Sequence, residues 1–164
     1  MAKVKVRYRG DESFPYLLGT DYVLSSSSKD RFVFEMTDGG GAITRVVAEG
    51  EGFVVKNGIL TKGVISGIEL QDDKQKPLAE LSALKIDAAE FHATLIDSGI
   101  HPLVDLMFAG NDKISSSAFN TSIYSGAGND VVRFAGRGYV EFIDGQGNDR
   151  YIGSALNDEI DNTV

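Results

Sequence analysis

Ser125-Gly126-Ala127-Gly128-Asn129-Asp130 is the stretch that decides the fold of this chain of 164 residues. The same chemistry returns at Asp144-Gly145-Gln146-Gly147-Asn148-Asp149, and further Asn-Asp pairs stand at 111–112 and 157–158. A degenerate copy, Asn120-Thr121, keeps the Asn but has lost the Asp. A short fixed period of glycine, aspartate and one apolar residue indicates a structural repeat.

The repeat has a period of nine residues, with one extra residue inserted between Asp130 and Asp149. Two residues after each Asp position stands an apolar side chain, which is expected to point inward. The resulting ladder is Ile114, Ile123, Val132, Phe142, Tyr151 and Ile160. Because the ladder continues through copies that lack the Asp, the constraint of the fold spans all six units.

A unit of nine residues, with one tight turn and one short strand, predicts half a coil of a parallel β-solenoid. Two units then complete one coil, so that alternate units stack on the same side. Asp112, Asp130 and Asp149 are therefore expected to lie on one side. The opposite side carries Thr121, a position near Val140, and Asp158, and it has lost its acid twice.

This one-sided column of aspartates predicts a cation site. Glycines with positive φ can turn backbone carbonyls toward a common point, and stacked turns are about 4.8 Å apart. The oxygens between such turns suit Ca²⁺, which takes about six to eight oxygen ligands, better than Mg²⁺. The expected metal ligands and turn residues are Asp112, Asp130, Asp149, Gly126, Gly128, Gly145, Gly147 and Asn129. A degenerate β-solenoid without metal, held by its apolar ladder, is the open alternative.

The segment from about 107 to 161 resembles the hemolysin-type (RTX) calcium-binding nonapeptide repeat, Gly-Gly-x-Gly-x-Asp-x-apolar-x. Residues 126–132 are a good copy of that pattern, 145–151 a fair one and 153–160 a weak one. The resemblance implies a right-handed parallel β-roll with calcium in its turns. It also implies a secreted, extracellular bacterial protein that leaves the cell by type I secretion, without an N-terminal signal peptide.

Residues 1–106 predict a strand-rich region that precedes the β-roll of residues 107–164, and we expect the two to form one continuous structural unit. The strict alternation of residues 2–9 predicts a half-exposed strand whose basic stripe is the solvated face of a sheet edge. Asn57-Gly58 predicts a tight hairpin. The serines of 25–28 predict a loop. A Gly-rich turn is expected at 38–41.

One helix is expected, at about residues 88–98. It begins with a capping box, in which Asp87 accepts from the backbone N–H of Glu90, and His101-Pro102 is expected to break it. We interpret this helix as the end cap of the repeat stack, since an open stack exposes its last apolar layer. For His92 and His101, capping or surface roles are favoured over metal or acid–base roles.

Composition excludes several classes of protein. With 42% apolar and 24% charged residues the chain is typical of a globular protein, and without cysteine it has no disulfide or thiolate metal site. The net charge of -8 argues against nucleic acid as a partner. No apolar run approaches the roughly 20 residues of a membrane span. The basic start of the chain lacks the apolar core of a cleavable signal.

These observations favour a calcium-stabilised binding or scaffold module, not an enzyme. Its partners would be calcium and an extracellular carbohydrate or protein. An enzyme acting on polysaccharide would need paired carboxylates on a strand face, for which Glu49, Glu51 and Glu69 are candidates. A self-associating adhesin, using the edge of the N-terminal strands to form a homo-oligomer, is the third hypothesis.

Overall fold

The computed structural model describes residues 3–6, 21–37, 43–97, 100–116, 121–135, 138–143, 145–154 and 158–161. The described chain is mainly β-strand, with two helices. Its strands are β1 (Lys3–Val6), β2 (Asp21–Ser27), β3 (Arg31–Thr37), β4 (Ile43–Lys56), β5 (Ile59–Gln71), β6 (Pro77–Asp87), β7 (Lys113–Ser116), β8 (Thr121–Tyr124), β9 (Val131–Phe134), β10 (Val140–Ile143), β11 (Arg150–Ile152) and β12 (Glu159–Asp161). The helices are α1 (Ala88–Asp97) and α2 (Ile100–Met107).

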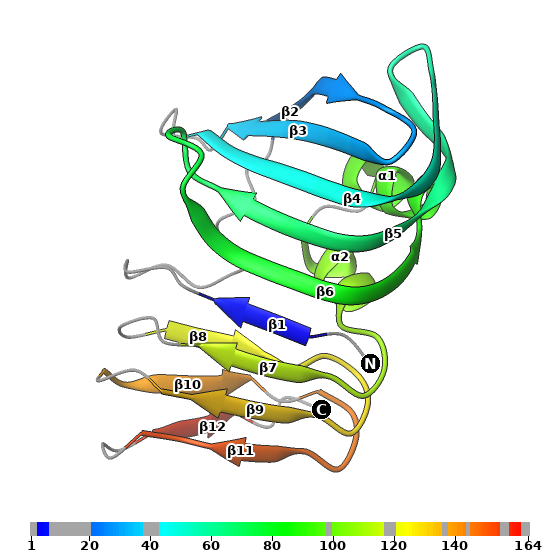
Figure 1. Cartoon of the computed structure of the whole chain (residues 1–164). Coiled ribbons are helices and arrows are strands. Elements are labelled where there is room, and N and C mark those ends of the chain that lie inside the picture. Colours follow the sequence, from blue (N-terminus) through cyan, green and yellow to red (C-terminus); the bar gives the residue numbers. More distant parts are fainter. Residues whose placement is uncertain are drawn as a thin grey trace.

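The strands form two sheets (Figure 1). The larger has nine strands in the order β11-β9-β7-β1-β6-β5-β4-β3-β2, and the smaller has three in the order β12-β10-β8. Strands β2 to β6 pair antiparallel as a meander. Strands β7, β9 and β11 pair parallel, as do β8, β10 and β12. The fold is therefore an antiparallel region joined to a stack of parallel strands.

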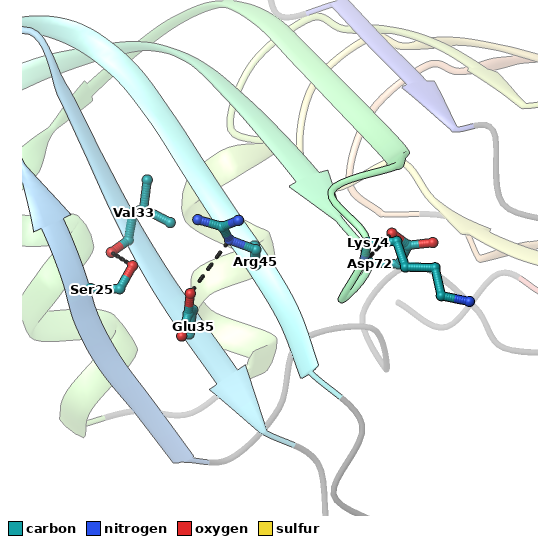
Figure 2. Close-up of polar contacts among 6 residues, drawn as sticks. All are labelled: Ser25, Val33, Glu35, Arg45, Asp72 and Lys74. Atoms are coloured by element: carbon teal, nitrogen blue, oxygen red, sulfur yellow. Dashed lines mark hydrogen bonds and ion pairs between the residues drawn. The ribbon is translucent and has the colours of Figure 1, made fainter.

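The predicted hairpin between β4 and β5 is confirmed. Asn57 and Gly58 both have positive φ, 51° and 78°, as the favoured two-residue hairpin turn requires. The loop expected at the serines of 25–28 is wrong, because β2 continues to Ser27. Pairing with β3 satisfies the backbone there, and the Ser25 hydroxyl donates to the Val33 carbonyl oxygen at 3.3 Å (Figure 2). The turn expected at 38–41 lies outside the described residues.

The antiparallel sheet curls around the two helices, which lie on its concave face (Figure 1). Alternate strand residues point to that face and form an aromatic core. The ring of Phe32, which is fully buried, lies 5.0 Å from Phe53 and 6.1 Å from Phe91 of α1. The predicted helix start is confirmed, since Asp87 Oδ1 accepts from the backbone N–H groups of Ala89 and Glu90, both at 2.9 Å.

Three expectations about this region are wrong. Helix α1 packs against β5 and β6, and the layer stacked on β7 is β1, so α1 is not the end cap of the repeat. Strand β1 is not at an edge, because it pairs antiparallel with β6 and parallel with β7. Helix α1 ends at Asp97, before Pro102 and close to the expected end, but a second helix, α2, begins at Ile100 where one helix alone was expected. Pro102 lies in the first turn of α2, where a proline removes no intrahelical hydrogen bond.

His92 is buried, contrary to the expected capping or surface role. Its side chain is 3% exposed, and its Nδ1 accepts a hydrogen bond from the backbone N–H of Leu60 at 2.9 Å. The rings of Phe34 and Tyr22 lie edge-on to it at 5.2 and 6.2 Å. Desolvation lowers the pKa of His92 below its ordinary value. The imidazole therefore ties helix α1 to strand β5 in its neutral form.

No helix in the described part of the chain is long and apolar enough to cross a membrane. Among these residues, only α1 and α2 are helical, and both are short.

We expect the stability of the protein to fall in mild acid because of His92. Its pKa is lower in the folded state than in the unfolded state, so its contribution is complete above pH about 6.5. The contribution decreases as the pH falls from there toward the lowered folded pKa. Thermal melts across this range should show a flatter pH dependence for His92→Gln than for the wild type. Equal slopes in the two proteins would contradict this assignment.

Candidate functional site

The register of the stack follows the period of the repeat. Ile114 pairs with Val132, and Val132 with Tyr151, in one sheet. Phe142 pairs with both Ile123 and Ile160 in the other. The predicted pairing of alternate units, including the extra residue before Phe142, is therefore confirmed.

The apolar ladder fills the space between the two sheets, with one exception. Val132 and Phe142 are almost completely buried, and Ile114 and Ile123 are buried as well. Tyr151 is partly buried and packs its ring 4.8 Å from that of Phe142. Ile160 was also expected to point inward, but it is 51% exposed. It belongs to β12, which pairs with β10 and is an edge strand of the smaller sheet among the described residues.

The three aspartates form a column on one side of the stack, each directly before a strand of the larger sheet. Asp130 Oδ1 accepts from the backbone N–H of Asp112 at 2.7 Å. Asp149 Oδ1 accepts from the backbone N–H of Asp130 at 2.6 Å. The side chains of Asp130 and Asp149 thus reach back to the preceding coil. The structure brings Asp112, Asp130 and Asp149 together as the period predicted.

The asparagines form a second column that runs in the opposite direction. Asn111 Oδ1 accepts from the backbone N–H of Asn129, and Asn129 Oδ1 accepts from that of Asn148, both at 2.8 Å. The side chains of Asn111 and Asn129 therefore reach forward to the next coil. Together the two columns link the first of the three turns to the second, and the second to the third. Asn129, predicted at the metal site, serves as one of these links.

The glycines allow these turns to approach one another closely. Gly128 and Gly147 have φ of 137° and 146°, a region that other residues rarely adopt. A Cβ at Gly128 would lie 2.2 Å from the Gly110 carbonyl oxygen, and one at Gly147 would lie 1.7 Å from that of Gly128. Gly126 and Gly145 also face a carbonyl oxygen of the preceding turn, that of Phe108 and of Gly126 respectively. All four predicted glycines are thus at coil-to-coil contacts.

The aspartate column buries its charge. Asp112 and Asp130 are 2% and 1% exposed, and Asp149 is partly buried. The second carboxylate oxygen, Oδ2, is buried in all three. Burial of an ionised carboxylate costs several kcal/mol unless hydrogen bonds or an opposite charge compensate it. The backbone N–H donors supply part of that compensation.

No group of three or more His, Asp or Glu side chains in the described residues gathers where it could hold a metal ion. A cation in the aspartate column would therefore take most of its ligands from backbone carbonyls and water. Such an all-oxygen set is of the kind that Ca²⁺ accepts.

The opposite side of the stack has different chemistry. Asp158 caps its own turn, where Oδ2 accepts from the backbone N–H of Ser154 at 2.6 Å and Oδ1 accepts from its hydroxyl at 3.1 Å. The Asp position is filled by Thr121 in the first copy. The aspartate column thus belongs to one side only, as the sequence indicated.

Sequence reasoning missed a polar strip on the smaller sheet. Glu141 and Glu159 are register partners on β10 and β12. The Ser122 hydroxyl donates to Glu141 Oε2, and the Tyr139 hydroxyl donates to Glu159 Oε2, both at 2.5 Å. The bond to Glu159 raises the pKa of Tyr139 to about 12. Glu141 and Glu159 are two repeat units apart in the sequence. The period of the repeat, applied to the outward-facing positions, would therefore have predicted that they are neighbours.

Comparisons with protein-family models, curated proteins and solved structures found no match to this chain. The properties of the site therefore rest on its sequence and geometry.

Replacement of a single glycine should reveal how closely the coils stack. Gly147→Ala should be more destabilising than Gly110→Ala. Both positions have positive φ, which costs about 1–3 kcal/mol for a residue with a side chain. A Cβ at position 147 would also clash with a backbone oxygen, whereas a Cβ at position 110 would have no atom of the described chain within 4 Å. Chemical denaturation measures the difference, and equal losses would show that the close approach has little energetic weight.

Proposed function

We propose that this chain is a calcium-stabilised binding or scaffold module of a secreted bacterial protein. The observation that carries the proposal is the column of three aspartates, in register, buried and confined to one side of the stack. Cations would lie between neighbouring turns, each held by two aspartates, Asp112 with Asp130 or Asp130 with Asp149, together with backbone carbonyls of the glycine-rich turns. Calcium would add positive charge beside these buried carboxylates.

The stack itself is proposed to be a right-handed parallel β-roll of the hemolysin type. Alternate units pair in parallel, in two sheets, with an apolar ladder between them. At these glycines, each turn approaches a carbonyl oxygen of the preceding turn so closely that a Cβ would clash with it. This close contact accounts for the recurrence of glycine at these positions of the repeat. These features support the resemblance of residues 107–161 to the RTX nonapeptide.

Calcium would act by stabilising the folded chain. A ligand that binds only the native state stabilises it by mass action, and ligands assembled by folding couple binding to folding. Export through a type I system would take the chain out of the cytosol, where calcium is scarce, before it folds. A module of this kind would present its surface to an extracellular carbohydrate or protein.

A metal-free stack is the second candidate, and a specific observation favours it. The Oδ1 atoms of Asp130 and Asp149 already accept hydrogen bonds from the coil before them. The aspartates can therefore serve as a structural ladder without a cation. In this case the backbone donors offset part of the cost of charge burial.

An enzyme remains a weaker hypothesis. Of the carboxylates considered for such a role, Glu49 and Glu69 line a common groove, whereas Glu51 does not. Their arrangement indicates ligand binding more directly than catalysis, as argued in the next subsection.

The calcium proposal predicts a shift in thermal stability. Saturating CaCl2 should raise the Tm by roughly 5–10 °C relative to excess chelator, since binding at about a hundred times Kd contributes about 2.7 kcal/mol. MgCl2 should have a much smaller effect. An identical Tm with calcium and with chelator would favour the metal-free stack.

Two matched variants locate the effect. Asp130→Asn keeps an oxygen that can accept from the Asp112 N–H but removes the charge, so it should abolish most of the calcium-dependent shift. Asp158→Asn, on the opposite side, should leave the shift unchanged although it weakens the Ser154 cap. An equal loss in both variants would contradict a one-sided site.

A further inference from the structure

The antiparallel sheet carries a groove on its outer face, the face turned away from the helices. Its volume is ≈ 210 Å³, and it runs across β3, β4, β5 and β6. Val47, which is 5% exposed, lines it together with the carboxylates of Glu49, Glu69 and Glu80. Figure 2 shows the neighbouring part of this face, where Arg45 contacts Glu35. The groove lies on β3 to β6, whereas the aspartates directly precede β7, β9 and β11.

The backbone conformation does not require glycine at position 67, and the absence of a side chain there leaves space in the groove. The φ of Gly67 lies outside the left-handed region, and a Cβ there would make only an ordinary contact of 3.5 Å with the Leu81 carbonyl oxygen. A register shift lies beside it, between Ile65 and Gly67. A glycine within a strand weakens the strand and often marks a place where a ligand approaches. Its missing side chain leaves space directly opposite Glu49 of β4.

The groove concentrates negative charge across three neighbouring strands. Glu69 and Glu80 are register partners on β5 and β6, and like charges placed directly opposite one another destabilise a sheet. Gln71 Nε2 donates to Glu69 Oε1 at 2.5 Å and fixes that carboxylate in place. Arg31 lies opposite Glu49, and Lys5 lies opposite Glu80. The lining itself thus holds three carboxylates and one guanidinium, that of Arg31.

The chemistry of this lining defines the class of ligand. Its carboxylates are hydrogen-bond acceptors only, so the ligand must supply donors. The three carboxylates lie on three different strands, β4, β5 and β6, so a ligand that reaches more than one of them is an extended molecule. The volume lies below the range of about 300–1,000 Å³ that is typical of sites for drug-sized ligands. We propose that the groove binds a small organic ammonium ion with several donors, such as a linear diamine or an amino sugar.

Binding can be tested on the full chain in saturating calcium, with 1,4-diaminobutane, glucosamine and glucose as probes. Titration calorimetry should show saturable binding of at least one amine and none of glucose, which matches glucosamine in size but lacks its charge. The backbone amide signals of Gly67 and Glu69 should shift on binding. Binding of glucosamine alone would identify an amino-sugar site, and binding of diaminobutane alone a diamine site.

Variants place the ligand within the groove. Glu69→Gln should weaken binding about tenfold or more, since a charge-assisted hydrogen bond is lost. Gly67→Val should fill the groove and abolish binding. Glu51→Gln removes the same charge from an exposed position of β4 outside the groove and should have no effect. Unchanged Tm values would show that the fold is retained, and Glu69→Gln keeps the test valid if Gly67→Val fails to fold.

Three results would overturn the proposal: no saturable binding of either amine, equal binding of glucose, or equal weakening by Glu69→Gln and Glu51→Gln. The calcium-dependent shift in Tm should be the same in Glu69→Gln as in the wild type. Failure of this proposal is therefore distinguishable from failure of the calcium proposal.

Discussion

The close approach of successive turns is the constraint on which the stack depends. At Gly128 and Gly147, the carbonyl oxygen of one turn occupies the space that a Cβ of the next turn would need. Only glycine permits this approach, and the same positions require positive φ. With the turns this close, short side chains such as Asp and Asn can reach the backbone of a neighbouring coil. The glycines thus set the spacing that the polar columns use.

Those columns make the stack directional, and they make its two sides chemically different. Aspartates reach back one coil and asparagines reach forward, so consecutive turns are tied to each other by side chains as well as by strands. The consequence is a row of buried carboxylates, which is costly in free energy unless it is compensated. The same residues can therefore be read as structural acceptors and as proposed ligands of a cation. Both roles use the Oδ1 hydrogen bonds. They differ in whether a bound cation is needed to offset the charge of the carboxylates.

The N-terminal strand connects this stack to the rest of the chain. β1 is antiparallel to β6 on one edge and parallel to β7 on the other, so that both its edges are hydrogen-bonded. It covers the first layer of the repeat, a role that the sequence had suggested for a helix. Helix α1 instead fills the concave face of the antiparallel sheet, tied there by His92. The opposite face of that sheet carries the groove in which ammonium binding is proposed.

The sequence by itself determined the features that depend on local geometry or on a fixed period. These are the Asn57-Gly58 hairpin, the Asp87 cap, and the register that pairs Ile114 with Val132 and Phe142 with Ile160. Turn chemistry and capping act over a few residues, and a repeat imposes its own pairing, so each can be deduced without knowledge of distant contacts.

Only the tertiary structure decided where β1 lies, what α1 covers and why His92 is buried. Each depends on residues far apart in the sequence, such as Lys3 beside Lys113 or Leu60 beside His92. The groove has the same origin, because Glu49, Glu69 and Glu80 become neighbours only when their strands pair. Pairing of non-repeating strands follows from the packing of the whole chain, and no local pattern in the sequence encodes it.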